Sequence, residues 1–392
     1  MLSDDVERVR RDPGPAILTA AVGVLIGVLL GAVLIGTGEA AKPASTTVPA
    51  SRSPAGKGPK ETKKHDGPKG TAKEAEMAPA SAGTNGTQEQ LGLTGAPSPQ
   101  LKKALEEAVL TAKPVGRLEL AVWANGWSDA AVAPPSAKTA QSRMWSMSKP
   151  VTAVALMEAL DGRAPEDHAF EAMQGALIRS ENCRQRRVVL ELQKHAGGAD
   201  KAAARIRSVL ERAGASPDVN IPLKPEGPED AQCDAVLRGL GADPASPALQ
   251  LGTAEWTVRD GAAFARALAA REYGKAGETP RRLMMRPKDR SHDPGVTDAD
   301  YSVSPEWGAR REFSRFPDLA FKGGWGGRRQ KRYLVGQIVS MTIHGVPVGV
   351  MGVFHPNVQP TVSDDPGDTK GPEEIERAFG TIAPVLDRTI RK

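Results

Sequence analysis

A long apolar segment near the N-terminus is the feature that most constrains how this chain can fold. Residues 14–38 contain no charged side chain, and residues 16–35 form a nearly continuous apolar run that is long enough to span a bilayer. Three arginines precede this run, so the positive-inside rule predicts a transmembrane helix over residues 15–37, with residues 1–14 as a short cytoplasmic tail. The rest of the chain is then extracytoplasmic, in a single-pass protein of the cell membrane.

The same segment supports two further interpretations. Gly23, Gly27 and Gly31 recur at every fourth position, and such small residues let two membrane helices approach closely. A homodimer through this face is therefore a hypothesis. The alternative to a membrane anchor is a cleaved signal peptide, because small residues follow the run at Ala40 and Ala41, although its apolar region would be unusually long.

Residues 38–97 are rich in Pro, Ala, Gly, Ser, Thr and Lys and contain almost no large apolar side chains. They cannot bury a core, so we expect a disordered linker that spans roughly 40 Å on average. The net charge of the chain is +5, and no aromatic residue accompanies the linker lysines, so nucleic-acid binding is not expected. Residues 98–392 remain for folding, which is enough for one large domain with two lobes.

A serine and a lysine mark the start of an apolar helical segment in this domain. Ser146 and Lys149 are nearly one helical turn apart, so their side chains share a face. A serine hydroxyl is a poor nucleophile until a base takes its proton, and a desolvated lysine can be that base. Pro150 fits a helix only in the first turn, which places Ser146 at the positive end of the helix dipole. A helix cap followed by a solvated lysine is the alternative interpretation.

Two later motifs strengthen the first interpretation. Ser180-Glu181-Asn182 follows a helical run, and a hydroxyl and a carboxamide at this spacing can relay a proton and hold a substrate amide. Lys322-Gly323-Gly324 precedes two predicted strands, residues 333–343 and 346–354, which are joined by a short His344-Gly345 turn. A cation at a strand edge can anchor a substrate carboxylate, and glycines let the backbone approach it.

In this order, Ser-x-x-Lys, Ser-x-Asn and Lys-x-Gly resemble the motif set of the penicillin-binding proteins and serine β-lactamases, the β-lactamase/transpeptidase-like serine hydrolases. The pattern is closest to the class A β-lactamase-like members, and the resemblance covers residues 98–392. It implies an α+β fold in which an antiparallel sheet is flanked by terminal helices, expected here over residues 101–109 and 372–386. An all-helical lobe would carry the second motif.

The resemblance also implies a role for each matching residue. Ser146 would be the acylated nucleophile, Lys149 its base and Ser180 a proton relay. The backbone N–H groups of Ser146 and Trp325 would form the oxyanion hole. The substrate would be a peptidoglycan stem peptide ending in D-Ala-D-Ala or a β-lactam, and neither a metal nor a cofactor is expected. The implied substrate-binding residues are Asn182, Lys322, Gly324 and Trp325.

Three departures from the family pattern are visible. Gly323 stands where the family has a Thr or Ser whose hydroxyl binds the substrate carboxylate. The first two motifs are closer together than usual in sequence, and the last two are farther apart. No Glu-x-x-Leu-Asn precedes Trp256, where a class A β-lactamase carries its deacylating glutamate, so a penicilloyl-enzyme should persist. The alternative function is that of a catalytically degenerate homologue that binds the cell wall or acts as a scaffold.

The two cysteines, Cys183 and Cys233, both lie outside the membrane in this topology and predict a single disulfide. Such a bond would tie the loop after the second motif to the Pro-rich segment around residues 221–228. Two buried free thiols are the alternative. The six histidines show no metal-ligand spacing.

Overall fold

The computed structural model describes residues 95–222, 225–226, 231–285, 308–316, 318–326, 334–357 and 370–391. The predicted cytoplasmic tail, the transmembrane helix with Gly23, Gly27 and Gly31, and nearly all of the linker lie outside these residues. Within the described ranges, no helix is both long and apolar enough to cross a membrane. The anchor and the homodimer therefore stay predictions.

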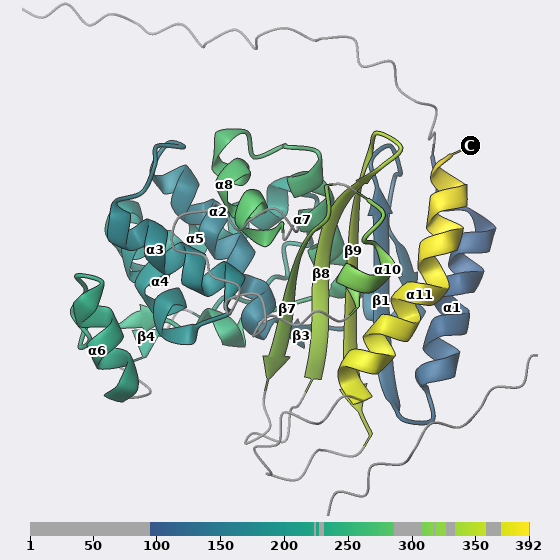
Figure 1. The fold of residues 1–392 in the computed structure, drawn as a ribbon, viewed down its shortest axis with the longest axis horizontal. Coiled ribbons are helices and arrows are strands. Elements are labelled where there is room, and N and C mark those ends of the chain that lie inside the picture. The colour runs from purple at the N-terminus through teal and green to yellow at the C-terminus, as the bar shows by residue number, and fades with distance from the viewer. Residues whose placement is uncertain are drawn as a thin grey trace, which may run out of the picture. The chain divides into compact units, whose positions relative to one another are not determined.

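A five-stranded antiparallel sheet with the order β2-β1-β9-β8-β7 forms the centre of the described structure (Figure 1). The predicted hairpin is confirmed, because β8 and β9 are joined by His344 and Gly345, which both have a positive φ. β7 is the edge strand on the side of the helical lobe, so it is free to border a site there. The strands of this sheet are β1 (Gly116–Ala124), β2 (Ala131–Ala133), β7 (Ala320–Gly326), β8 (Leu334–Ile343) and β9 (Val346–Pro356).

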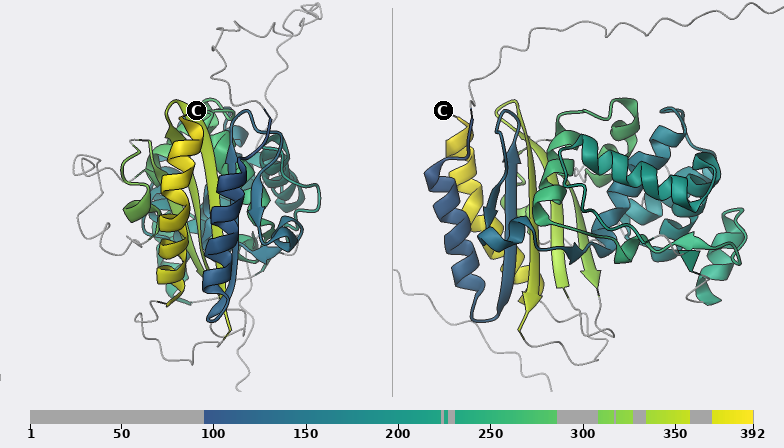
Figure 2. Two further views of the ribbon diagram at one scale, coloured as in Figure 1. Left: turned by 90° about the vertical axis from the view of Figure 1, so that its right-hand side faces the viewer. Right: turned by 180° about the vertical axis from the view of Figure 1, so that it is seen from behind.

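The two terminal helices, α1 (Pro99–Ala112) and α11 (Lys370–Ile390), lie side by side and cover one face of the sheet (Figure 2). α1 begins where the sequence provides a cap: the Ser98 hydroxyl accepts a hydrogen bond from the Leu101 N–H, and Pro99 occupies the first helical position. Its buried stripe, which includes Leu101 and Leu105, faces the core. Both terminal helices are where the sequence predicts them.

The opposite face of the sheet is covered by α7 (Val258–Ala269), which begins at a capping box formed by Thr257 and Asp260. Glycine makes this contact possible, since a Cβ on Gly349 of β9 would lie 2.0 Å from the Ala262 carbonyl oxygen. Beyond α7 lies a lobe built mainly of helices (Figure 1). Its helices are α2 (Lys149–Ala159), α3 (Asp167–Ile178), α4 (Asn182–Ala196), α5 (Ala199–Arg212), α6 (Ala231–Gly239) and α8 (Lys275–Met284).

Short elements connect the lobe to the sheet. A two-residue ladder, β3 (Ser142–Arg143) with β6 (Glu255–Trp256), precedes both α2 and α7, and a second one pairs β4 (Pro225–Glu226) with β5 (Ala248–Leu249). The helix α10 (Ala309–Glu312) packs against α11. The predicted α+β fold, with an antiparallel sheet, flanking terminal helices and a helical lobe, is confirmed.

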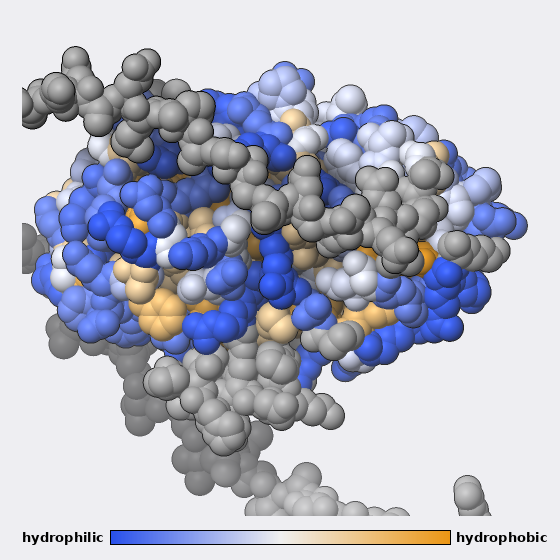
Figure 3. Space-filling view, turned by 90° about the horizontal axis from the view of Figure 1, so that it is seen from above, coloured by the Kyte–Doolittle hydropathy of each residue, from blue (hydrophilic) through white to orange (hydrophobic). Residues whose placement is uncertain are grey.

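The surface is mostly hydrophilic in the view of Figure 3, and apolar side chains occupy small separate areas of it. Among the described residues, the exposed large apolar side chains are Leu110, Val115 and Trp325. Leu110 and Val115 lie at or just after the end of α1. Trp325 belongs to the third sequence motif, so one of these exposed apolar side chains lies on the edge strand β7.

Candidate active site

Ser146 lies in a tight turn directly before α2. A 3₁₀ helix covers Trp145–Ser148 and continues into α2 at Lys149, so Pro150 falls in the first turn, as the sequence requires. Trp145 has a φ of 45°, a strained value for a residue with a side chain. The Ser148 hydroxyl supports this conformation by donating to the Trp145 carbonyl oxygen over 2.7 Å. The turn leaves Ser146 half-buried.

Strand β7 packs directly against this turn because two of its residues are glycines. A Cβ on Gly326 would lie 1.8 Å from the Trp145 ring, and a Cβ on Gly324 would lie 2.9 Å from Cγ of Met147. No larger residue could bring the two backbones this close without movement. Trp325 and Ser146, whose N–H groups the sequence analysis predicts as an oxyanion hole, border the same cleft as a result. Their role stays a prediction.

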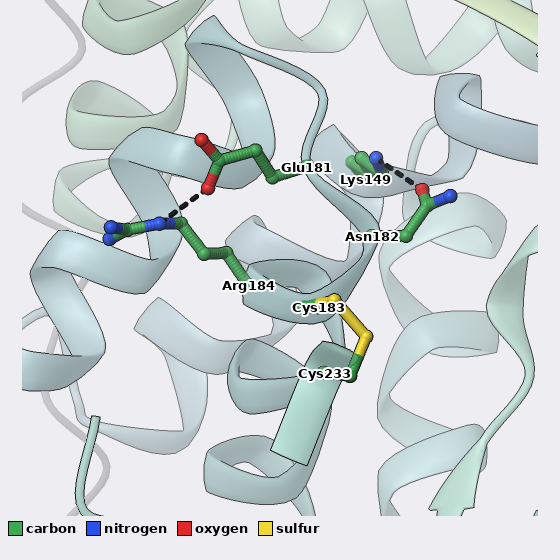
Figure 4. The surroundings of a disulfide bond; sticks show 6 residues. All are labelled: Lys149, Glu181, Asn182, Cys183, Arg184 and Cys233. Atoms are coloured by element: carbon green, nitrogen blue, oxygen red, sulfur yellow. Dashed lines mark hydrogen bonds and ion pairs between the residues drawn. A yellow bond between two sulfur atoms is a disulfide. The ribbon is translucent and has the colours of Figure 1, made fainter. Parts of the chain in front are cut away.

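Lys149 is almost completely buried, with 3% of its surface exposed. Its Nζ donates to the Ser180 carbonyl oxygen at 2.5 Å and to the Ser180 hydroxyl at 3.3 Å. It also donates to Oδ1 of Asn182 at 3.0 Å (Figure 4). In the described part of the chain, no carboxylate forms an ion pair with it. Burial lowers the pKa of Lys149 to about 7, although the charge of Glu181 acts in the opposite direction. Near neutral pH, a large fraction of this amine can therefore accept a proton.

A second buried lysine meets the same serine from the other side. Lys322 on β7 is 1% exposed, and its Nζ donates to the Ser180 hydroxyl at 2.8 Å and to the Gly323 carbonyl oxygen at 2.8 Å. Ser180 Oγ thus lies between two lysine amines. When Lys322 donates to this oxygen, the hydroxyl proton of Ser180 is free to point toward neutral Lys149. The arrangement can pass a proton between the first and third motifs.

Ser180 is held in this position by the N-terminus of α4. It has a φ of 63°, and the next residue, Glu181, is the N-cap of the helix. The Glu181 carboxylate pairs with Arg179 at 2.5 Å and with Arg184, so its charge is directed away from Lys149 (Figure 4).

The predicted disulfide between Cys183 and Cys233 is present, and it ties the first turn of α4 to α6 (Figure 4). The Cα atoms of the two cysteines are 5.1 Å apart. From the sequence, we expect the bond to reach the Pro-rich segment around residues 221–228. The structure places the second cysteine just beyond it, in the helix that follows.

A cleft of about 240 Å³ opens next to Ser146. Of the predicted site residues, Ser146, Lys149, Asn182 and Trp325 line it. Lys322 does not line it, because its ammonium group is turned toward Ser180. The described lining contains no aspartate or glutamate.

The wall of the cleft includes residues that the motifs do not identify. The segment Leu249–Thr253, just before β6, contributes Gln250, so a carboxamide occupies the part of the chain where the family pattern has its glutamate. Gln185 and Arg186 of α4 also line the cleft. Their spacing of three and four residues from Asn182 is the signal that could have placed them on the same helix face.

No protein-family model matches this chain, and no curated protein matches its sequence. Solved structures of similar fold include a class A β-lactamase from Bacteroides cellulosilyticus, with 11% identity over 74% of this chain and 99% of that chain, and a TM-score of 0.46. PBP-A shares 14% identity over 75% of this chain and 98% of its own, with a TM-score of 0.44. A class A β-lactamase from Mycobacterium abscessus shares 15% identity over 72% and 99%, with a TM-score of 0.45. Because these proteins are similar to the chain in fold alone, its chemistry has to be inferred from the arrangement of its own residues.

Proposed function

We propose that this protein is a membrane-anchored, extracytoplasmic serine hydrolase or acyltransferase of the penicillin-binding type. It acts on D-Ala-D-Ala peptides or β-lactams through an acyl-Ser146 intermediate. The observation that carries the proposal is Lys149: a buried lysine that pairs with no carboxylate among the described residues, one turn from a serine at a cleft, with its pKa lowered to about 7. A lysine whose ammonium group is solvated at the protein surface has none of these properties.

Acylation begins when neutral Lys149 takes the Ser146 proton as Oγ attacks the substrate carbonyl carbon. In the described structure, the Ser146 hydroxyl is not among the hydrogen-bond acceptors of Lys149. It rotates toward Nζ when substrate binds, because hydrogen bonds between a nucleophile and its base are often formed only in the complex. The N–H groups of Ser146 and Trp325 stabilise the oxyanion. Lys149 then returns the proton through Ser180 to the departing nitrogen as the C–N bond breaks.

The acyl-enzyme formed in this way is long-lived. Its hydrolysis needs a base to activate water, and the described lining of the cleft supplies no carboxylate. With a β-lactam, the protein therefore behaves as a penicillin-binding protein rather than as an efficient β-lactamase. With a peptide, water or an amine is the acyl acceptor.

A second candidate function is that of a catalytically degenerate cell-wall-binding or scaffolding module. Two observations favour it: Gly323 lacks the hydroxyl that binds a substrate carboxylate in the family, and Lys322 is buried rather than presented to the cleft. Both weaken substrate recognition and leave the fold intact.

Labelling of the full chain with a fluorescent penicillin, followed by denaturing electrophoresis, separates the two functions. A covalent band is expected for the wild type and is lost in Ser146→Ala and Lys149→Ala. Ser136→Ala and Lys102→Ala, at exposed positions outside the cleft, serve as matched controls and keep the band. The band should persist for hours after excess penicillin is removed. A folded chain that gives no band supports the scaffold, and rapid loss of the band contradicts the proposed slow deacylation.

A further inference from the structure

Gln185 is a buried polar residue in the cleft that the proposed mechanism does not use. It lies on α4, three residues after Asn182, and only 9% of its surface is exposed. Neither Oε1 nor Nε2 of its carboxamide has a hydrogen-bond partner within the described structure. The residue lines the cleft next to Ser146, and its two amide atoms are buried in the wall of that cleft, so a rotation of the side chain would bring them to the space that a substrate would enter.

Two other polar residues of α4 have hydrogen-bond partners for their side chains. Arg187 donates from Nε to the Leu240 carbonyl oxygen at 2.9 Å and pairs with Glu191 at 2.5 Å. Gln193, a second glutamine on the helix, uses both of its polar atoms: Nε2 donates to the Pro247 carbonyl oxygen, and Oε1 accepts from the Leu249 N–H, each at 2.9 Å. Buried carboxamides are normally paired in this way. Gln185 differs from Arg187 and Gln193 because it lines the cleft.

The donor and acceptor of an unpaired carboxamide determine which ligand group can pair with it. Gln185 offers one acceptor and an NH₂ donor side by side in one plane. A second amide matches both, since its N–H can donate to Oε1 while its carbonyl oxygen accepts from Nε2. A carboxylate would leave Oε1 without a donor, and an apolar group would satisfy neither atom. Val189 and Leu249 line the same cleft and supply apolar contacts for the carbon chain that carries such an amide.

We infer that Gln185 forms a specificity subsite that recognises an amide on the acyl chain of the substrate. Side chains three residues apart on a helix are about 5–6 Å apart at Cβ, so this amide lies one helical turn beyond the group that contacts Asn182. The inference deepens the proposed function and rests on it, because it names the class of acyl group that Ser146 would accept.

Two penicillins test the subsite: one with an acyl side chain that ends in a primary carboxamide, and one in which an isopropyl group, similar in shape but without polar atoms, replaces it. Their acylation rate constants with the full chain are measured by competition with fluorescent penicillin. Two neutral hydrogen bonds predict a preference of about 10- to 100-fold for the carboxamide. Gln185→Leu should abolish this preference by slowing acylation by the carboxamide penicillin to the rate of the isopropyl one. Gln174→Leu, which is on α3 and outside the cleft, is the matched control.

A second measurement keeps the subsite separate from the proposed chemistry. The full chain with Ser146→Ala is titrated with the two penicillins by calorimetry, with and without Gln185→Leu. Binding of the carboxamide that is weakened at least tenfold by Gln185→Leu supports the subsite even if no covalent band forms, in which case only the proposed function fails. Labelling of Ser146 without any carboxamide preference overturns the subsite and leaves the proposed function standing. No binding and no labelling overturn both.

Discussion

The lowered pKa of Lys149 predicts how acylation depends on pH. Only the neutral amine can take the Ser146 proton, and with a pKa of about 7 roughly half of the protein is in this form at pH 7. A lysine with the ordinary pKa of 10.5 would be neutral in only about 0.03% of the molecules at that pH. Burial thus accounts for about a thousandfold in the concentration of active base. The acylation rate should fall about tenfold per pH unit below 6.5 and level off above pH 8.

The assay is the second-order rate constant of labelling by fluorescent penicillin between pH 5 and pH 9. His355, a half-buried group, has its pKa lowered to about 4 by desolvation and by Arg117, so it does not titrate in this range. Glu119, whose pKa is raised by burial, accepts a hydrogen bond from Ser142, so its titration can affect the acylation rate at the acidic end of the range. Glu119→Gln is the control, because it removes this titrating group. A rate that is constant from pH 5 to pH 8, or that keeps rising tenfold per pH unit up to pH 9, would refute Lys149 as the base.

Three other predictions follow from single contacts or segments. Gly326→Ala places a Cβ within 2.0 Å of the Trp145 ring, so it should lower the free energy of unfolding by about 1–3 kcal/mol and slow acylation. Gly239→Ala, with nothing within 4 Å of its Cβ, should change neither stability nor acylation. Urea unfolding measures the stability of each variant, and penicillin labelling measures its acylation rate. Reducing the disulfide, which joins cysteines 50 positions apart, should lower stability by about 4 kcal/mol, and mass spectrometry of the unreduced chain should find no alkylatable thiol. Immunoblots of membranes should show the full-length chain; a released fragment that begins near residue 42 would contradict the anchor.

Local patterns in the sequence predict much of the fold. The β8–β9 hairpin follows from two apolar runs separated by His344-Gly345, since the turn needs residues that tolerate positive φ. The start of α2 follows from Pro150, which is compatible only with a first turn. The terminal helices follow from their apolar periodicity. Each of these features depends on residues close together in the chain.

The arrangement of the site depends on residues far apart in the chain and is less accessible from sequence. The motifs identify Lys149, Ser180 and Lys322, but no pattern indicates that one hydroxyl lies between two amines, because these contacts join residues 31 and 142 positions apart. The short ladders of β3 with β6 and of β4 with β5 have two residues per strand, too few for any period to be seen. Gln250 reaches the cleft through tertiary packing, which propensity does not encode.

Lys149 and Gln185, two buried polar groups in unfavourable surroundings, line the same cleft. Folding lowers the pKa of Lys149 from 10.5 to about 7, so the unfolded chain binds more protons between these values and stability rises with pH across this window. The loss of folding stability caused by burying Lys149 is complete below pH 7, where it is about 5 kcal/mol. The unpaired carboxamide of Gln185 adds the desolvation of two atoms. A leucine or methionine at either position would avoid the cost, so folding alone does not explain these residues. The proposed roles, a proton acceptor beside Ser146 and an amide partner one turn away, account for them.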